Sequence, residues 1–215
     1  MKKFAVILAG SGVFDGAEIH EATLTLLAIK KQGADYEIFA PDIPQHHVIN
    51  HFTGKEMPEK RNVLVESARI ARGNIKSLTQ FKADAFDAII LPGGFGVAKN
   101  LCSWAFEGDN CKVNPDVEKA IKGMYDAKKP IGAMCIAPII LGKLFPGTNL
   151  TTGDDKASAD FIKKMGSEYT KTTHREVVID KTRKLFTTPC YMLDADIVQI
   201  AEGTENIVRE MLKLM

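Results

Sequence analysis

Cys135 is the side chain of this sequence best placed for covalent chemistry. A short apolar run, residues 130–134, leads directly into it, and a helix pattern begins at Pro138. A thiol at such a strand-to-helix turn projects from a sharp bend, and the dipole of the following helix favours its thiolate form, so the pattern predicts a nucleophile elbow. The spacings among the four cysteines contain no CxxC pair, which argues against a zinc ribbon or a thioredoxin-like dithiol. The other three are Cys102, Cys111 and Cys190.

Two further loops are predicted to meet this cysteine at one edge of a sheet. Residues 10–18 and the loop after Leu91 each follow an apolar strand pattern, and ligands of open parallel sheets bind beyond the carboxyl ends of the strands. The backbone N–H groups of Gly93 and Gly94 have no side chain in the way, so they can stabilise a developing oxyanion. Glu18 lies just past the first strand, within reach of the same crevice as a general acid or base.

Each of these features has a simpler structural interpretation when it stands alone. A cysteine after an apolar strand is usually a small buried hydrophobic residue, and a Pro-Gly-Gly sequence is usually a turn. Glu18, taken alone, is a first-turn residue that stabilises its helix dipole. The coincidence of the three at matching strand ends favours a reactive site over three separate structural roles.

The elements that must position these residues alternate between short apolar runs and helical patterns, which is typical of an α/β fold. Continuous apolar runs such as residues 4–9 and 88–91 predict strands buried on both faces. We therefore expect a three-layer sandwich with a mostly parallel, flavodoxin-like sheet and helices on both faces. Residues 177–180 and 184–187 predict a β-hairpin, and Gly203 marks a break in the last helix. Further strands are predicted at 35–40 and 130–134, and helices at 17–31, 63–72, 115–128, 138–141, 156–164 and 194–214.

The composition is that of one globular domain. The chain has 215 residues, 45% of them hydrophobic, and its 28 basic and 27 acidic residues give a formal net charge of +1. This balance excludes a strongly basic nucleic-acid binder and provides no positive field for anionic membranes. A single domain over residues 1–215 is predicted. Within it, the proline-punctuated residues 41–84 are interpreted as a subfamily insertion that caps the site or packs in a dimer.

The cysteines are expected to be free thiols in a reducing cytoplasm. The apolar run at the start of the chain, residues 4–9, is shorter than the ~7–15 residues of a secretory signal, and no run approaches the ~20 residues of a membrane span. No metal or cofactor is predicted. His46, His47 and His51 lie in a loop without matching ligand spacing, and the pair 154–155 is interpreted as a helix N-cap.

The combined motifs resemble the protein deglycase and intracellular-protease branch of the class I glutamine amidotransferase-like superfamily. This resemblance covers residues 4–40 and 86–145. The sequence is more similar still to the ElbB type, described as a glyoxalase or as an enhancing-lycopene-biosynthesis protein, which links it by name to isoprenoid biosynthesis. That closer resemblance extends over essentially the whole chain. The segments that carry it are residues 12–21, 48–51, 61–64 and 134–138.

The resemblance implies a cysteine-dependent, cofactor-independent glyoxalase. Such an enzyme converts glyoxal or methylglyoxal, its small aldehyde substrate, to the 2-hydroxy acid through a hemithioacetal. Carried over by position, Cys135 is the nucleophile and Glu18 its carboxyl partner. The N–H groups of Gly93, Gly94 and Ile136 fall where the family forms its oxyanion hole. A homodimer is the expected assembly, without nucleic-acid or membrane partners.

One departure from the family pattern concerns histidine. Members of the superfamily carry a histidine after the cysteine or in a later Thr-Thr-His, whereas this chain has Ile136 and, at residues 151–153, Thr-Thr-Gly. His20 is the candidate substitute base. Two alternatives to the glyoxalase stay open: a glutamine amidotransferase-like subunit that lacks the usual histidine, and a non-enzymatic redox or carbonyl-stress sensor or chaperone.

Overall fold

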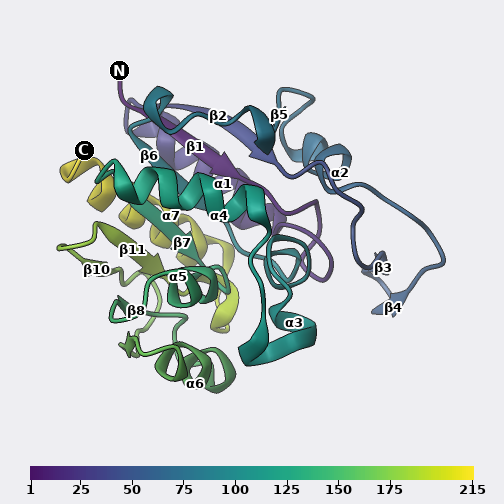
Figure 1. Cartoon of the computed structure of the whole chain (residues 1–215). Coiled ribbons are helices and arrows are strands. Elements are labelled where there is room, and N and C mark those ends of the chain that lie inside the picture. The colour runs from purple at the N-terminus through teal and green to yellow at the C-terminus, as the bar shows by residue number, and fades with distance from the viewer.

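The computed structural model describes all 215 residues and contains one large sheet with helices on both faces (Figure 1). Its strands are β1 (Lys3–Ile7), β2 (Asp35–Ala40), β5 (Lys76–Ser77), β6 (Ala88–Leu91), β7 (Ile131–Met134), β10 (Val178–Asp180) and β11 (Leu185–Thr188). Their order across the sheet is β10-β11-β7-β6-β1-β2-β5, and every pairing is parallel except that of β10 with β11. The predicted flavodoxin-like α/β fold, including its antiparallel hairpin at one edge, is confirmed.

The main helices cover the two faces of this sheet. They are α1 (Ile19–Lys31), α2 (Val63–Ile70), α4 (Pro115–Asp126), α5 (Pro138–Leu144), α6 (Lys156–Lys164) and α7 (Ile197–Lys213). Helices α1 and α7 pack against each other on one face, and α4 and α5 lie over the other (Figure 1). The strands β6 and β7 are buried along their whole length, as the continuous apolar runs predict. No helix combines the length and the apolar character needed to cross a lipid bilayer.

Helix α7 runs without interruption through Gly203, so the expected break there is wrong. A glycine inside a helix costs about 0.5–1 kcal/mol relative to alanine. The buried stripe of Ile200, Ile207 and Val208 offsets that cost by packing against the sheet. The helix also begins with a capping box, in which Asp196 accepts from the Gln199 backbone and the Gln199 side chain accepts from the Asp196 backbone.

The segment 41–84 holds α2 and a two-stranded arm that projects from the body of the fold (Figure 1). The arm packs against the loop 10–18: the Ile49 N–H donates to the Asp15 carboxylate at 2.6 Å, and the His51 ring stacks on Phe14 with centroids 5.0 Å apart. This part of the chain therefore supports a loop at the carboxyl edge of the sheet. The strands of the arm are β3 (Ile49–Asn50) and β4 (Lys55–Glu56).

Short elements complete the chain, and sequence periodicity indicates none of them because each spans too few residues. They include a two-stranded parallel sheet, β8 with β9, beside the main sheet. Their bounds are β8 (Asn149–Leu150), β9 (Glu168–Tyr169), α3 (Trp104–Glu107), a π-helical turn at Val97–Leu101, and 3-10 turns at Leu78–Gln80, Ala83–Ala85, Gly108–Asn110 and Cys190–Met192.

Candidate active site

Cys135 occupies the turn between β7 and α5 with a backbone φ of 58°. A residue with a Cβ pays of order 1–3 kcal/mol for such a conformation, so the surrounding structure must impose it. Part of that restraint is a hydrogen bond of 3.0 Å from the Cys135 N–H to the Thr188 carbonyl on β11. The sharp strand-to-helix bend predicted at this position is confirmed, and the cysteine, only 7% exposed, lines a cavity.

The loop after β6 approaches the cysteine so closely that residue 93 must be glycine. A Cβ built on Gly93 would lie 2.8 Å from the Cys135 sulfur and 2.6 Å from Oε2 of Glu21. Gly94 has a φ of 97° and packs against the backbone of Gly16 and Glu18. The Pro-Gly-Gly sequence therefore lets the backbone approach the thiol at Gly93 and the loop 10–18 at Gly94, as well as forming a turn.

The carboxylate in contact with Cys135 belongs to Glu21, whereas the sequence had pointed to Glu18. Glu21 is fully buried, and its Oε2 and the Cys135 sulfur both lie next to Gly93. Its Oε2 accepts from the Gly93 N–H at 2.9 Å, and its Oε1 accepts from the Tyr191 N–H at 3.2 Å. These contacts fix the carboxylate between two backbone segments and the sulfur.

Glu18 has a different task, because it is the N-cap of α1. Its carboxylate accepts from the Glu21 N–H at 2.7 Å and so satisfies one of the free donors of the first helical turn. The sequence shows two carboxylates three residues apart at a helix start, the spacing of a capping box, in which the second side chain reaches back to the N–H of the first residue. Here the Glu18 N–H donates to the Gly93 carbonyl at 2.9 Å, so Glu21 is free to point to the cysteine, and the sequence does not indicate that contact.

The surroundings of Cys135 disfavour the ionised thiolate form of its side chain. Burial, followed by the charge of Glu21, raises the pKa of the Cys135 thiol well above its ordinary value. The expectation that the helix dipole favours the thiolate is therefore wrong, since desolvation outweighs it. Burial, with the nearby charge of Glu18, also raises the pKa of Glu21 to about 7. Near neutral pH the thiol thus keeps its proton, and the carboxylate beside it has a basicity suited to accept that proton.

The three predicted oxyanion-hole donors are divided between two tasks. The backbone N–H groups of Gly94 and Ile136 face the Cys135 sulfur and oppose the rise in its pKa. The Gly93 N–H is already committed to Glu21. Gly94 and Ile136 are therefore the donors left to stabilise negative charge that develops at the sulfur or on an atom bound to it.

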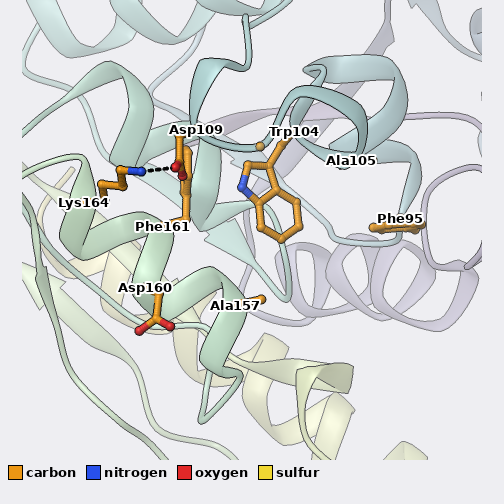
Figure 2. A pocket seen from close by; sticks show the side chains of 9 residues that line it. Phe95, Trp104, Ala105, Asp109, Ala157, Asp160, Phe161 and Lys164 are labelled. Atoms are coloured by element: carbon orange, nitrogen blue, oxygen red, sulfur yellow. Dashed lines mark hydrogen bonds and ion pairs between the residues drawn. The ribbon is translucent and has the colours of Figure 1, made fainter.

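A cavity of about 310 Å³ opens above Cys135, and hydrophobic side chains dominate its walls. A second cavity, of about 450 Å³, adjoins it and shares Phe95, Trp104 and Ala157 (Figure 2). Sequence reasoning missed these walls, because α3 and the start of α6 come together only through the tertiary fold. The cavity above the cysteine is lined by Val13, Phe14, Gly94, Phe95, Trp104, Cys135, Ile136, Asp155, Ala157, Tyr191 and Met192.

His20 and Cys190 lie close to the site without lining its cavity. The His20 Nδ1 is 2.9 Å from the Tyr191 hydroxyl, so this ring is coupled to the cavity wall and not to the thiol. Cys190 is buried, has a φ of 44°, and directly precedes Tyr191 in the turn that binds Glu21. The charges of Glu21 and Cys135 contribute, after burial, to a raised pKa of the Cys190 thiol.

The remaining predicted polar groups have structural contacts. The His46 ring stacks on Phe106 at a centroid distance of 3.9 Å, and the Asp155 carboxylate caps α6 by accepting from the Ser158 N–H at 2.8 Å. The cap agrees with the interpretation of residues 154–155. None of the five histidines hydrogen-bonds to Cys135 or Glu21.

Comparison with known proteins adds family information to this geometry. The model of the DJ-1/PfpI family matches residues 11–190. The ES1 protein homolog, mitochondrial, of Rattus norvegicus is 42% identical over 222 residues, which cover 99% of this chain and 84% of that protein. The mitochondrial glutamine amidotransferase-like class 1 domain-containing protein 3 of Homo sapiens is also 42% identical, over 99% of this chain and 83% of its own length.

The mitochondrial names of these relatives overturn the expectation of a cytoplasmic location. Composition and cysteine usage are too indirect to decide the compartment.

Solved structures support the same fold. An isoprenoid biosynthesis protein with an amidotransferase-like domain from Ehrlichia chaffeensis superposes with a TM-score of 0.93 at 35% identity, covering 100% of this chain and 99% of that one. Glyoxalase III from Candida albicans superposes with a TM-score of 0.63 at 14% identity, covering 100% and 97%. At that lower identity the likeness concerns the fold alone.

Proposed function

The chain belongs to the DJ-1/PfpI family, and we propose that it is a cofactor-independent glyoxalase that converts glyoxal or methylglyoxal to the 2-hydroxy acid through a hemithioacetal on Cys135. The observation that carries the proposal is the buried Glu21 carboxylate, which the N–H groups of Gly93 and Tyr191 hold beside the Cys135 thiol and whose pKa is raised to about 7. A carboxylate of that basicity can take a proton and return it near neutral pH. The glyoxalase III of Candida albicans shows that the same fold can hold a glyoxalase site.

The first step is addition of the thiol to the aldehyde. Glu21 takes the thiol proton while the Cys135 sulfur bonds to the aldehyde carbon, so no free thiolate has to persist in the buried site. Negative charge passes to the former carbonyl oxygen. The N–H groups of Gly94 and Ile136 stabilise it until Glu21 returns the thiol proton to this oxygen, which gives the hemithioacetal and leaves Glu21 ionised for the next step.

The second step is an internal oxidation and reduction within the substrate. Glu21 removes the proton from the hemithioacetal carbon to give an enediolate and returns it to the neighbouring carbon. The proton of the hemithioacetal hydroxyl passes to the neighbouring oxygen, and the product is the thioester of the 2-hydroxy acid. Water then cleaves the thioester, releases the acid and regenerates the Cys135 thiol. One carbon is oxidised and its neighbour reduced, so the balance requires only water and no external redox partner.

The pH dependence of turnover tests this role of Glu21. Below its raised pKa of about 7 the carboxyl is protonated and cannot accept the thiol proton; above it the base is ionised. We therefore expect kcat/KM for glyoxal to rise with pH through about 7 and then level off. The measurement is glycolate formation by purified protein across a pH series, without added thiol or metal. A rate that is constant from acid to neutral pH would contradict the assignment.

A peroxide sensor is a second candidate function, and Cys190 is the observation that favours it. This thiol is buried beside the turn that binds Glu21, and it interacts electrostatically with Cys135. A hydroperoxide reaching the cavity would oxidise Cys135 to the sulfenic acid and leave as the alcohol. The Cys190 thiol would then displace water to form a disulfide, so that the two sulfurs supply the two electrons that reduce the peroxide.

Peptide mapping after treatment with a hydroperoxide tests this second function. The expected product is a disulfide between the Cys135 and Cys190 peptides. In Cys190→Ser, Cys135 should pass on to the sulfinic acid because its resolving partner is gone. Recovery of both cysteines as free thiols, or of sulfinic acid in the unaltered chain, would rule the sensor out.

A further inference from the structure

The cavity above Cys135 is larger and more apolar than the binding of a glyoxal molecule requires. Glyoxal has two carbonyl groups and no apolar substituent, so it gains nothing from hydrophobic walls. The cavity nevertheless measures about 310 Å³, and nine of its eleven lining residues are hydrophobic. Volumes near ~300 Å³ and above, with apolar walls and few polar groups, are typical of sites that enclose a whole organic ligand.

The apolar walls are also unusually open to water in the free protein. Phe14 is 44% exposed and Phe95 is 40% exposed, and both face the cavity. Covering the exposed aromatic surface of a concave site with an apolar group lowers the free energy of the complex. The arm holds Phe14 in this position by stacking His51 on its ring, so the surface is built into the fold.

The direction in which a substituent would extend follows from the two adjoining cavities. They share Phe95, Trp104 and Ala157, which line both cavities, and Figure 2 shows the three along the second one. The far side of that second cavity becomes polar at the ion pair between Asp109 and Lys164 (Figure 2). Room for an apolar group therefore extends from Cys135 past Trp104 and ends where the charges begin.

We propose that the preferred substrate is a 2-oxoaldehyde whose second carbon carries a bulky apolar substituent, such as an aryl group. This inference rests on the glyoxalase function proposed above. The aldehyde carbon bonds to the Cys135 sulfur, its oxygen accepts from Gly94 and Ile136, and the substituent lies against Phe95 and Trp104. Glyoxal and methylglyoxal fit the same reacting groups but leave the aromatic walls exposed to water.

Turnover of glyoxal, methylglyoxal and phenylglyoxal provides the first test. In a hydrophobic pocket one methylene changes kcat/KM by roughly 10–200-fold, so phenylglyoxal is expected to exceed glyoxal by at least about tenfold. Ala157→Phe fills the shared rim from an exposed helix position and should abolish that preference. Ala157→Ser, the matched control, should keep it. Equal kcat/KM values for the three aldehydes would overturn the inference while leaving the glyoxalase function intact.

The fluorescence of Trp104 gives a second readout that does not depend on turnover. It is the only tryptophan of the chain and it lines the cavity, so its emission reports directly on occupancy. Benzyl alcohol, an unreactive aromatic probe, should change the emission saturably in the unaltered chain and in Ala157→Ser, but not in Ala157→Phe. If no aldehyde is turned over, the proposed function fails and the substrate preference fails with it, and this titration then tests only whether the cavity binds an apolar group. Absence of a saturable change in the unaltered chain overturns the inference.

Discussion

Replacing Cys135 with alanine is expected to reduce conversion of glyoxal to glycolate by roughly a thousandfold or more, to the background rate. The sulfur is the atom that bonds to the aldehyde, and no other nucleophile lines the cavity next to the N–H groups of Gly94 and Ile136. Alanine retains the Cβ, so the strained turn keeps its geometry. Thermal unfolding should therefore change little, which separates loss of chemistry from loss of fold.

Cys102→Ala is the matched control for this experiment. Cys102 is buried like Cys135 but lies in a different part of the core, where its thiol donates to the Val97 carbonyl at 3.4 Å. Burial raises the pKa of that thiol to about 12, so it contributes no nucleophile. Activity should persist in the control variant. Comparable turnover in both variants would remove Cys135 from the mechanism.

The architecture of this chain could be predicted from the sequence because its pattern is strong where the sheet is buried. The continuous apolar runs at β6 and β7 leave no ambiguity about strands covered on both faces. Helix α4 could also be predicted, because Pro115 suits a first helical turn, and the structure adds Asn114 as its N-cap. The arm at residues 49–56 could not be predicted, because two-residue strands carry no periodicity and their position depends on contacts with Asp15 and Phe14.

The location of the reactive turn could also be predicted, but the partners of its thiol could not. A strand-to-helix junction is visible in sequence, whereas the choice between Glu18 and Glu21 depends on which carboxylate the helix start consumes. The protonation states of Cys135 and Glu21 could not be predicted for a related reason. Sequence shows the helix dipole that favours a thiolate, but not the complete burial of Glu21 and its contact with Cys135, which together dominate the pKa of both groups.

Glu21→Gln is expected to lower kcat/KM for glyoxal by about 10²–10⁴-fold, the usual contribution of a positioned acid–base group. The amide cannot accept the thiol proton and cannot carry a proton between the two substrate carbons. Its oxygen can still accept from either Gly93 or Tyr191, so the carboxylate's place in the fold is partly preserved. Glycolate formation measures the loss, and thermal unfolding measures the cost of the weakened backbone contact.

Glu18→Gln is the matched control, because it makes the same chemical change one helical turn earlier. Its amide oxygen can continue to accept from the Glu21 N–H and cap α1, so turnover should fall by less than about tenfold.

The pH profile of turnover separates a role of Glu21 in proton transfer from a role in positioning. The residual activity of Glu21→Gln should lack the rise near pH 7, since the group whose raised pKa causes it is gone, whereas Glu18→Gln should keep a rise. Removing the charge of Glu18 should also shift that rise to lower pH, because this charge helps to raise the pKa of Glu21. A profile in Glu21→Gln that is reduced in height but unchanged in shape would assign Glu21 a positioning role only, and the proton transfers would then belong to another group.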